Sequence, residues 1–472
     1  MNKTKFLRFY LISLTTLSCL VIIILTLFPY DFFIQETLSQ FSYDFLFKRT
    51  ERPDNLKDLI LNILLFIPFG FGCTAFLTQV LNIKIVTVTK LVIAVSFILS
   101  FTIEILQLFI PTRNPTYVDL LMNTLGGVTG FLLFYFFRKY ISKIFLQVTT
   151  ISEKILSIPV LSFLIIIYIV LASAFNLKFL EAIKTWNLSN WDLDYRLVLG
   201  NEITEDRPWN GNISQICIAN RKISELEINQ ILKDENCDGI ENNLITAYQF
   251  TPTNKNYFAD RQGNSPNLLG KKQQLNYPNQ DSVQLGESNW LHTEKPVTLL
   301  NQKIRDSSQF TLFIKYATLS LNQTGPSRII SISKNPYNRN LTLGQWNNNL
   351  SIRIRNLITK KNGTRPEFSV AKFFTDTEYH NLIITYSINN FSVYLDELSN
   401  KQRINFSPQT TLFWNLSPPF SSIIHVDNNN TRLYYLIYYI TLVSPVAILI
   451  YLIIEQLIPF HGIQKSKVKS QK

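Results

Sequence analysis

Two carboxylates and two carboxamides lie inside long apolar runs of this sequence, where ionisable groups are rare. Glu104 and Gln107 are three residues apart in one run, and Asp119 and Asn123 are four apart in the next. Each spacing puts both members of a pair on the same face of a helix. A carboxylate at the centre of a membrane helix costs at least about 2.5 kcal/mol unless it is paired or hydrated. The cluster could therefore bind a polar headgroup or a proton, or it could be a polar contact that fixes helix packing.

Three further polar residues accompany these four. Asp58 and Asn62 share a helix face in an earlier apolar run, and Arg113 lies on the connection that leads to Asp119. Because the connection 111–116 is short, the helices on either side of it are expected to be antiparallel neighbours. Arg113 could then neutralise one carboxylate. The predicted membrane polar cluster comprises Asp58, Asn62, Glu104, Gln107, Arg113, Asp119 and Asn123.

The order and spacing of these residues resemble the VanZ-like family. The matching elements are the Asn-x3-Phe-x-Pro-x-Gly stretch at Asn62–Gly70, the pair Glu104 and Gln107, Arg113, and the run Asp119–Gly127. The resemblance covers roughly residues 5–140. It implies a connection to the cell envelope, because the family is similar to a membrane protein associated with low-level teicoplanin resistance. It supplies no established reaction.

The apolar runs are long enough to cross a membrane. The chain has 472 residues, of which 46% are hydrophobic, but residues 176–432 are polar and rich in Asn. A bilayer core needs roughly 20 apolar residues in helical form. Six segments meet that length: 6–28, 56–80, 88–110, 117–137, 155–175 and 433–454. The first lacks a small-residue cleavage site and is interpreted as an anchor, not as a signal peptide.

Positive charge is distributed unevenly between the connections. Lys and Arg gather in short segments that carry almost no acid, whereas the loop 29–55 is more acidic. The basic positions are Lys3, Lys5, Arg8, Lys84, Lys90, Arg138, Lys139, Lys143, Lys154, Lys465, Lys467, Lys469 and Lys472. Such residues favour the cytoplasmic side, which predicts both termini inside and residues 176–432 outside a bacterial cytoplasmic membrane. The net charge of +12 then reflects contact with anionic lipid and not binding of nucleic acid.

The polar segment has the pattern of an antiparallel sandwich. Residues 310–316, 328–332 and 350–355 alternate between apolar and polar side chains, and Asn-rich turns such as 347–349 separate such runs. Residues 379–387 and 391–396 form a predicted hairpin closed by Asn389 and Asn390. This hairpin resembles the laminin-G and concanavalin A-like lectin sandwich, and the resemblance implies an all-β jelly roll.

A second part of the lectin resemblance comes earlier in the chain. Residues 197–202, 207–211 and 213–228 look like the closing strands and short helix of such domains, yet they precede an opening strand at 247–250. One sandwich with permuted strand order is the simplest account, because residues 191–235 alone are too few to form a core. The alternative is two separate domains.

The predicted organisation is a helical membrane bundle of six transmembrane helices with a sandwich inserted before the last. Residues 1–150 form a VanZ-like module of four helices, and 151–175 form the fifth. Residues 176–432 form the extracytoplasmic sandwich, 433–454 the sixth helix and 455–472 a basic cytoplasmic tail.

Patterns for catalysis are scarce in the polar segment. Glycan hydrolysis usually needs two carboxylates that flank the bond, and the nearest pair, Glu225 and Glu227, falls where a surface helix is expected. No His spacing predicts a metal site, and no motif predicts a cofactor. The six Trp residues could stack on sugar rings, although most are expected in the core. Cys217 and Cys237 could form a disulfide outside the cytoplasm or remain two free thiols.

Three functions remain open. The preferred one is an envelope protein that binds a glycan or lipid-linked precursor through its lectin-like domain, without established catalysis. The second is a membrane enzyme or carrier that acts on a lipid-linked substrate at Glu104 and Asp119. The third is a structural adaptor that uses the sandwich for protein contacts. Membrane lipids are the expected partners in all three.

Overall fold

The computed structural model divides the chain into two compact units. One comprises Met1–Ala172 with Thr441–Lys472, and the other comprises Ser173–Ile440. The structure describes residues 3–27, 56–110, 113, 115–155, 157–252, 256–271, 275–416, 423–427 and 431–457. The acidic loop 29–55 and most of the predicted basic tail, 458–472, lie outside the described residues.

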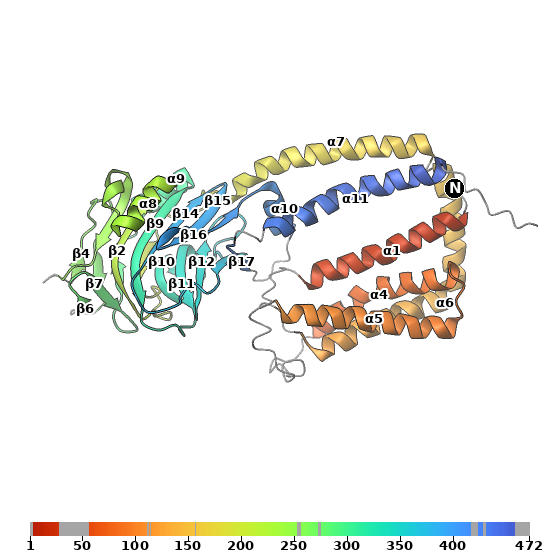
Figure 1. Ribbon diagram of the computed structural model, residues 1–472, viewed down its shortest axis with the longest axis horizontal. Helices are drawn as coiled ribbons and strands as arrows, with labels where there is room; N and C mark the ends of the chain where they lie inside the picture. The colour runs from red at the N-terminus through yellow and green to blue at the C-terminus, as the bar shows by residue number, and fades with distance from the viewer. Residues whose placement is uncertain are drawn as a thin grey trace, which may run out of the picture. The chain divides into compact units, whose positions relative to one another are not determined.

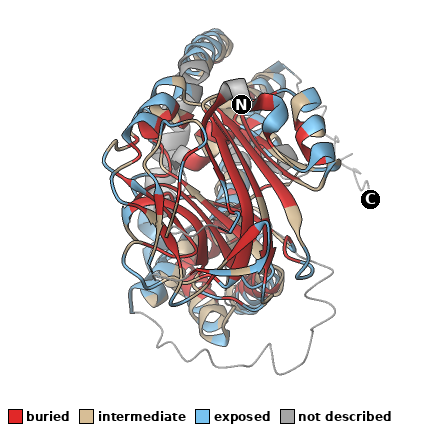
Figure 2. Ribbon diagram, turned by 90° about the vertical axis from the view of Figure 1, so that its left-hand side faces the viewer, coloured by how far each residue is buried: buried red, intermediate tan, exposed pale blue. Residues whose placement is uncertain are grey.

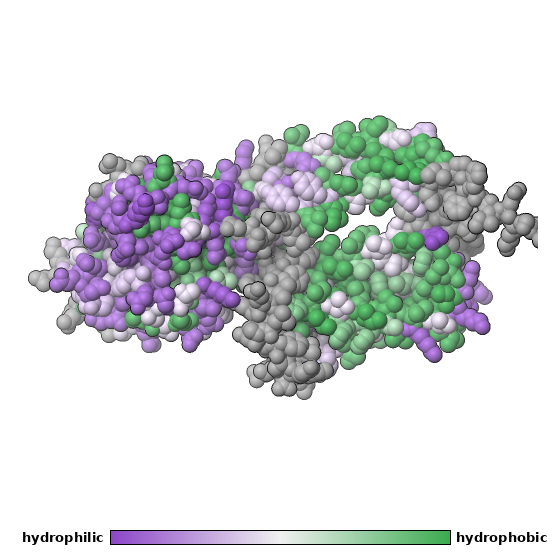
Figure 3. All heavy atoms as spheres, in the orientation of Figure 1, coloured by the Kyte–Doolittle hydropathy of each residue, from purple (hydrophilic) through white to green (hydrophobic). Residues whose placement is uncertain are grey.

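The first unit is helical. It contains α1 (Lys3–Thr26), α4 (Leu56–Gln79), α5 (Ile85–Leu108), α6 (Tyr117–Ile155), and parts of α7 (Ile158–Ala182) and α11 (Thr431–Leu457) (Figure 1). Five helical segments of the described chain are long and apolar enough to cross a membrane: Leu56–Gln79, Ile85–Leu108, Tyr117–Tyr140, Ile158–Leu177 and Tyr434–Ile454. The apolar part of α1, Tyr10–Thr26, is shorter. The helices present a largely hydrophobic surface, whereas the sandwich is mostly hydrophilic (Figure 3).

The fourth and fifth predicted spans correspond to α6 and α7. α6 continues as one helix beyond the apolar segment Tyr117–Tyr140 and ends at Ile155. α7 begins at Ile158, so the predicted boundary at residue 150 falls within α6. The Tyr168 hydroxyl on α7 donates a hydrogen bond to the Leu442 carbonyl on α11 at 2.8 Å. These two helices run side by side (Figure 1).

Glycines bring α4 and α6 into backbone contact. A Cβ added at Gly70 would lie 2.1 Å from the Gly127 carbonyl oxygen, and one added at Gly130 would lie 2.2 Å from the Ile67 carbonyl oxygen. No larger side chain fits at these separations, and small residues are what permits close approach of membrane helices. The glycines of 126–130 therefore allow α4 and α6 to approach to backbone contact.

The second unit contains a β-sandwich of two sheets. One sheet has the strand order β17-β13-β12-β11-β10-β1-β8-β5-β4, and the other has β16-β15-β14-β9-β2-β7-β6, with β3 paired to β2. The strands of the first sheet are β1 (Arg196–Leu199), β4 (Tyr257–Phe258), β5 (Leu268–Gly270), β8 (Leu291–Thr293), β10 (Ser327–Asn335), β11 (Asn338–Trp346), β12 (Asn349–Ile354), β13 (Glu367–Val370) and β17 (Ile423–His425). The strands of the second are β2 (Gly211–Ala219), β3 (Leu244–Gln249), β6 (Asn276–Asn279), β7 (Ser282–Leu285), β9 (Phe310–Thr318), β14 (His380–Ser387), β15 (Asn390–Leu395) and β16 (Glu397–Asn405).

The early segment supplies an interior strand to each sheet. β1 lies between β10 and β8, with Leu197 opposite Ile332, and β2 pairs along its length with β9, with Ile216 opposite Ile314. Residues 191–235 are therefore an integral part of the sandwich and not a detached unit. In the later hairpin, Ser387 pairs with Asn390, so the turn is one residue earlier than predicted.

The sheets enclose an aromatic core. Most strand residues are buried, as the red ribbons of Figure 2 show. Trp186 stacks on Phe406 with ring centroids 4.0 Å apart, and Phe310 stacks on Tyr386 at 5.5 Å. Short α-helices of the described chain accompany the sheets: α8 (Glu225–Asp234), α9 (Thr298–Ser307) and α10 (Pro408–Leu416). Buried aromatic pairs contribute about 0.5–1.5 kcal/mol each beyond the area they bury, so this core fixes the packing of the two sheets.

Candidate functional site

The polar residues of the helical unit are organised around Thr116, which immediately precedes α6. The Thr116 hydroxyl donates to Asp119 Oδ2 at 2.9 Å and accepts the Asp119 backbone N–H at 3.0 Å. A Thr before a helix satisfies one of the free N–H groups of the first turn in this way. The Thr116 backbone N–H donates to Glu104 Oε2 at 3.1 Å. One residue therefore links the carboxylates of α5 and α6.

The carboxamides connect these helices to their neighbours. The Asn62 side chain on α4 donates to Asp119 Oδ1. The Asn123 side chain donates to the Ser100 hydroxyl on α5 at 3.0 Å. The Asn123 Oδ1 atom is buried, and it has no hydrogen-bond partner among the described residues. Glu104 is also buried, with 8% of its surface exposed. The interior between α4, α5 and α6 is thus rich in hydrogen-bond acceptors.

Gln107 and Arg113 also reach α1. The Gln107 side-chain amide donates to the Thr26 carbonyl at 2.9 Å, and Arg113 Nη2 donates to the Leu25 carbonyl at 3.1 Å. The last carbonyls of a helix lack intrahelical partners, so both side chains complete the C-terminal end of α1. Asp58 is exposed and forms no hydrogen bond or ion pair with the rest of the described chain.

Of the seven predicted residues, the structure joins Asn62 and Asp119 directly and Glu104 to Asp119 through Thr116. Asn123 lies one turn further along α6, while Gln107 and Arg113 turn towards α1. Sequence reasoning missed Thr116, although Thr-x-x-Asp before an apolar run is a recognisable signal for the start of a helix. It also missed the α1 carbonyls, because every residue has a main-chain carbonyl and the sequence does not show which of them accept side-chain hydrogen bonds.

One tryptophan of the sandwich is available for stacking. Trp346, at the end of β11, is 48% exposed, and the turn residues Asn347 and Asn348 beside it are exposed as well. The other five are buried: Trp186, Trp191, Trp209, Trp290 and Trp414. Aromatic rings that face water can stack on the apolar faces of sugars, while asparagine amides can hydrogen bond to hydroxyls.

The two candidate carboxylates of the sandwich have structural partners. Ser224 and Glu227 form a capping box at the start of α8, and Glu227 forms an ion pair with Arg221. The hydrogen bonds from Arg221 lower the pKa of Glu227 to about 2. Glu225 pairs with Lys401 at 2.5 Å. Within the described residues, no group of three or more His, Cys, Asp and Glu side chains is placed to hold a metal ion.

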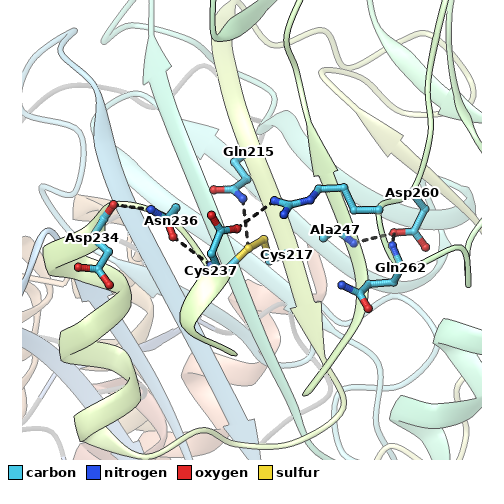
Figure 4. The surroundings of a disulfide bond; sticks show 10 residues. Gln215, Cys217, Asp234, Asn236, Cys237, Ala247, Asp260 and Gln262 are labelled. Atoms are coloured by element: carbon cyan, nitrogen blue, oxygen red, sulfur yellow. Dashed lines mark hydrogen bonds and ion pairs between the residues drawn. A yellow bond between two sulfur atoms is a disulfide. The ribbon is translucent and has the colours of Figure 1, made fainter. Parts of the chain in front are cut away.

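Cys217 and Cys237 form a disulfide, with their Cα atoms 6.6 Å apart (Figure 4). It ties β2 to the segment after α8, and both cysteines are buried in a cluster that includes Ile228 and Ile231 of that helix. The Gln215 amide donates to the Cys237 sulfur at 3.2 Å. Nearby, the Asp260 carboxylate accepts the backbone N–H of Ala247 at 2.7 Å, which holds the following loop against β3 (Figure 4).

Comparison with known protein families gives a match for the helical part of the chain. Neither the curated proteins nor the solved structures contain a significant match to this chain. No lectin family is identified for the sandwich. Residues 14–138, which contain the Thr116 network and the glycine contacts between α4 and α6, match the VanZ/LLP1 family, so this helical part of the chain is VanZ-like.

Proposed function

We propose that this chain is a cell-envelope membrane protein that binds a lipid-linked envelope precursor or another envelope glycan. The observation that carries the proposal is the linkage of Glu104 and Asp119 through Thr116, at the end of the VanZ-like helices where α5 ends and α6 begins. Ionisable residues inside membrane segments usually serve ligands, ions or protons, because packing alone is achieved more cheaply with apolar side chains.

The chemistry of the network favours a ligand rich in hydrogen-bond donors. Two carboxylates provide acceptors, as does Asn123 Oδ1, which has no hydrogen-bond partner among the described residues. Sugar hydroxyls and a headgroup ammonium are suitable donors, and either carboxylate could instead take up a proton. A polar headgroup could thus be held at the edge of the bilayer while its acyl chains remain in lipid.

The sandwich would supply a separate binding surface for envelope glycan. Its support is the exposed Trp346 with its neighbouring asparagines, together with the laminin-G and concanavalin A-like resemblance of the strand pattern. The proposed topology places both termini in the cytoplasm and residues 176–432 outside. A disulfide between Cys217 and Cys237 fits that location, because disulfides persist in oxidising compartments.

Lipid analysis of full-length protein in native nanodiscs tests the binding function. We expect an envelope lipid or precursor to co-purify with the wild type and to be lost from Glu104→Gln and Asp119→Asn at unchanged expression. Thr102→Val is the matched control, because Thr102 lies on α5 but is exposed and bonds only within its own helix, to the Ile98 carbonyl. Reduced expression with unchanged lipid content would indicate a packing role and contradict the proposal. A bound lipid that is chemically altered only by the wild type would instead support the enzyme alternative.

Labelling in intact cells tests the topology. A cysteine introduced at the exposed Asn348, in a chain without Cys19 and Cys73, should react with a membrane-impermeant maleimide before lysis. Reaction only after lysis would place the sandwich in the cytoplasm.

A further inference from the structure

Three arginines occupy adjacent strands of the nine-stranded sheet. They are Arg328 on β10, Arg339 on β11 and Arg353 on β12. Arg328 and Arg339 are each 1% exposed, which is exceptional for a residue type that is almost never fully buried without a partner. Buried guanidinium groups need acceptors, so the partners of each arginine decide what the cluster can do.

Two of the three arginines are paired with carboxylates. Arg353 Nε lies 2.6 Å from Glu367 Oε2, and Arg328 Nε lies 3.5 Å from Glu202 Oε2. Glu202 also accepts hydrogen bonds from the hydroxyls of Ser331 and Ser333. Both carboxylates are therefore occupied by groups other than Arg339.

Two side-chain nitrogens of Arg339 lack a hydrogen-bond partner among the described residues. Its Nε and Nη1 atoms are buried and form no hydrogen bond within the described part of the chain. The Arg339 backbone N–H donates a hydrogen bond to the Lys361 carbonyl oxygen at 3.1 Å, so the main chain holds the residue in place. Burial, followed by the charges of Arg328 and Arg353, lowers the pKa of Arg339 to about 9. Three cations against two carboxylates leave one positive charge without a counter-ion.

We propose that Arg339, flanked by Arg328 and Arg353, binds a small oxyanion, either a phosphate or a carboxylate group. The planar guanidinium matches such a group with two parallel N–H donors, and charge-assisted bonds of this kind are among the strongest in proteins. A bound oxyanion would accept hydrogen bonds from the Arg339 guanidinium and balance the charge of the cluster. The side chains of Arg353 and Glu367 are each 14% exposed, so they mark the side from which solvent and ligand reach the cluster.

This anion site is distinct from the network around Thr116, and it does not depend on glycan stacking at Trp346. The shared chemistry is a phosphate or carboxylate, whether free in solution or attached to a sugar. Water is the competing occupant, since a buried water can satisfy a polar group if it finds two to four partners. Water is neutral and cannot balance the positive charge of the cluster. A measurement of anion binding therefore distinguishes an oxyanion from water at this position.

The test is calorimetric titration of full-length protein in phosphatidylcholine nanodiscs at constant ionic strength, with inorganic phosphate and with glucose 1-phosphate. We expect saturable binding to the wild type and a loss of at least tenfold in affinity for Arg339→Gln. Lys334→Gln is the matched control, because Lys334 is an exposed cation on β10 and the substitution changes the net charge equally. Tighter binding of glucose 1-phosphate would indicate an anion carried on a sugar, and equal binding would indicate a free anion.

A second measurement keeps the result interpretable if Arg339→Gln affects folding. In phosphate-free buffer, removal of an unpaired buried charge should leave the thermal midpoint of this variant at or above that of the wild type. Phosphate should then raise the midpoint of the wild type and of Lys334→Gln but not that of Arg339→Gln. Absence of saturable binding of both probes by the wild type would overturn the proposal, as would equal binding by Arg339→Gln.

Discussion

The side-chain amide of Asn62 on α4 donates a hydrogen bond to the carboxylate of Asp119 on α6, 57 positions later in the chain. The same two helices touch through their backbones further along, where Gly70 meets Gly127 and Gly130 meets Ile67. A polar contact at one end and glycine contacts along the length thus define a single helix pair. We expect loss of the polar contact and loss of the glycine contacts to have different consequences.

Asn62→Leu should weaken the helical unit modestly. The substitution removes a hydrogen bond between helices, which is worth about 0.5–2 kcal/mol in membrane proteins, and it leaves one Asp119 oxygen without this donor. Reversible unfolding in mixed detergent micelles would measure the loss. Thr102→Val, on the exposed face of α5, should leave stability within about 0.5 kcal/mol of the wild type. Equal stability of Asn62→Leu and the wild type would show that the bond contributes nothing to folding.

Gly130→Leu should be far more damaging. The new side chain would meet the Ile67 carbonyl and the Phe71 backbone nitrogen, neither of which can move without separating α4 from α6. We expect loss of folded protein on size-exclusion chromatography. Leu125→Val is the control, because Leu125 lies on the same helix with 46% of its surface exposed. A monodisperse, lipid-binding Gly130→Leu protein would contradict the close packing of these helices.

His380 should make the stability of the sandwich depend on pH. Its Nδ1 and Nε2 atoms lie 2.7 Å from Asp396 Oδ2 and 2.9 Å from Asp376 Oδ1. The Asp396 hydrogen bond, opposed by burial and assisted by Asp376, raises the pKa of His380 to about 9. The unfolded value is about 6.5, so this stabilisation is complete below about pH 6.5 and is lost as pH rises through 9.

The loss should be about 1 kcal/mol, less than the whole pKa shift implies, because the Asp376 side chain is 47% exposed and its interaction is screened by water. Denaturant midpoints at pH 6.5, 8 and 9.5 would show a decline in the wild type and a flatter profile in His380→Gln. His292→Gln should retain the decline, because burial lowers the pKa of His292 away from this range. A decline of equal size in His380→Gln would assign it to another group.

The double substitution of Cys217 and Cys237 by Ala should destabilise the sandwich by about 3 kcal/mol. The bond closes a loop with a sequence separation of 20, and a cross-link of that length restricts the unfolded chain by about this amount. Thermal unfolding with and without reductant would measure the effect. Reductant should lower the midpoint of the wild type but not that of the double variant. Replacement of the free Cys19 and Cys73 by Ala should preserve the response to reductant.

Trp346→Ala should abolish sandwich binding to isolated envelope glycan without a change in the thermal midpoint. The ring is exposed at the end of β11, so its removal leaves no cavity in the core. Tyr337→Ala is the control, because Tyr337 is 73% exposed in the turn that precedes β11. Co-sedimentation with purified cell-wall material would measure binding. Equal binding by Trp346→Ala and the wild type would remove the stacking role and favour the adaptor alternative for the sandwich.

Local patterns in the sequence determined most of the elements. The apolar composition and length of three segments predicted α4, α5 and α7, because the thickness of the bilayer sets a minimum length for a membrane helix. Alternation at 310–316 and 350–355 predicted β9 and β12, since a half-buried strand repeats every two residues.

Only the tertiary structure decided which distant groups meet. The Thr116 link between Glu104 and Asp119 depends on a main-chain N–H, and the Gln107 contact with Thr26 spans 81 positions. The three arginines lie on the adjacent strands β10, β11 and β12, and the burial of Arg328 and Arg339 could not be inferred from the alternating pattern of those strands. Hydrophobic periodicity reports the environment of one segment at a time, whereas partners are selected by the packing of segments far apart in the chain. For that reason the sequence predicted the helices and strands, while the structure alone revealed the Thr116 network and the buried Arg339 nitrogens that lack partners among the described residues.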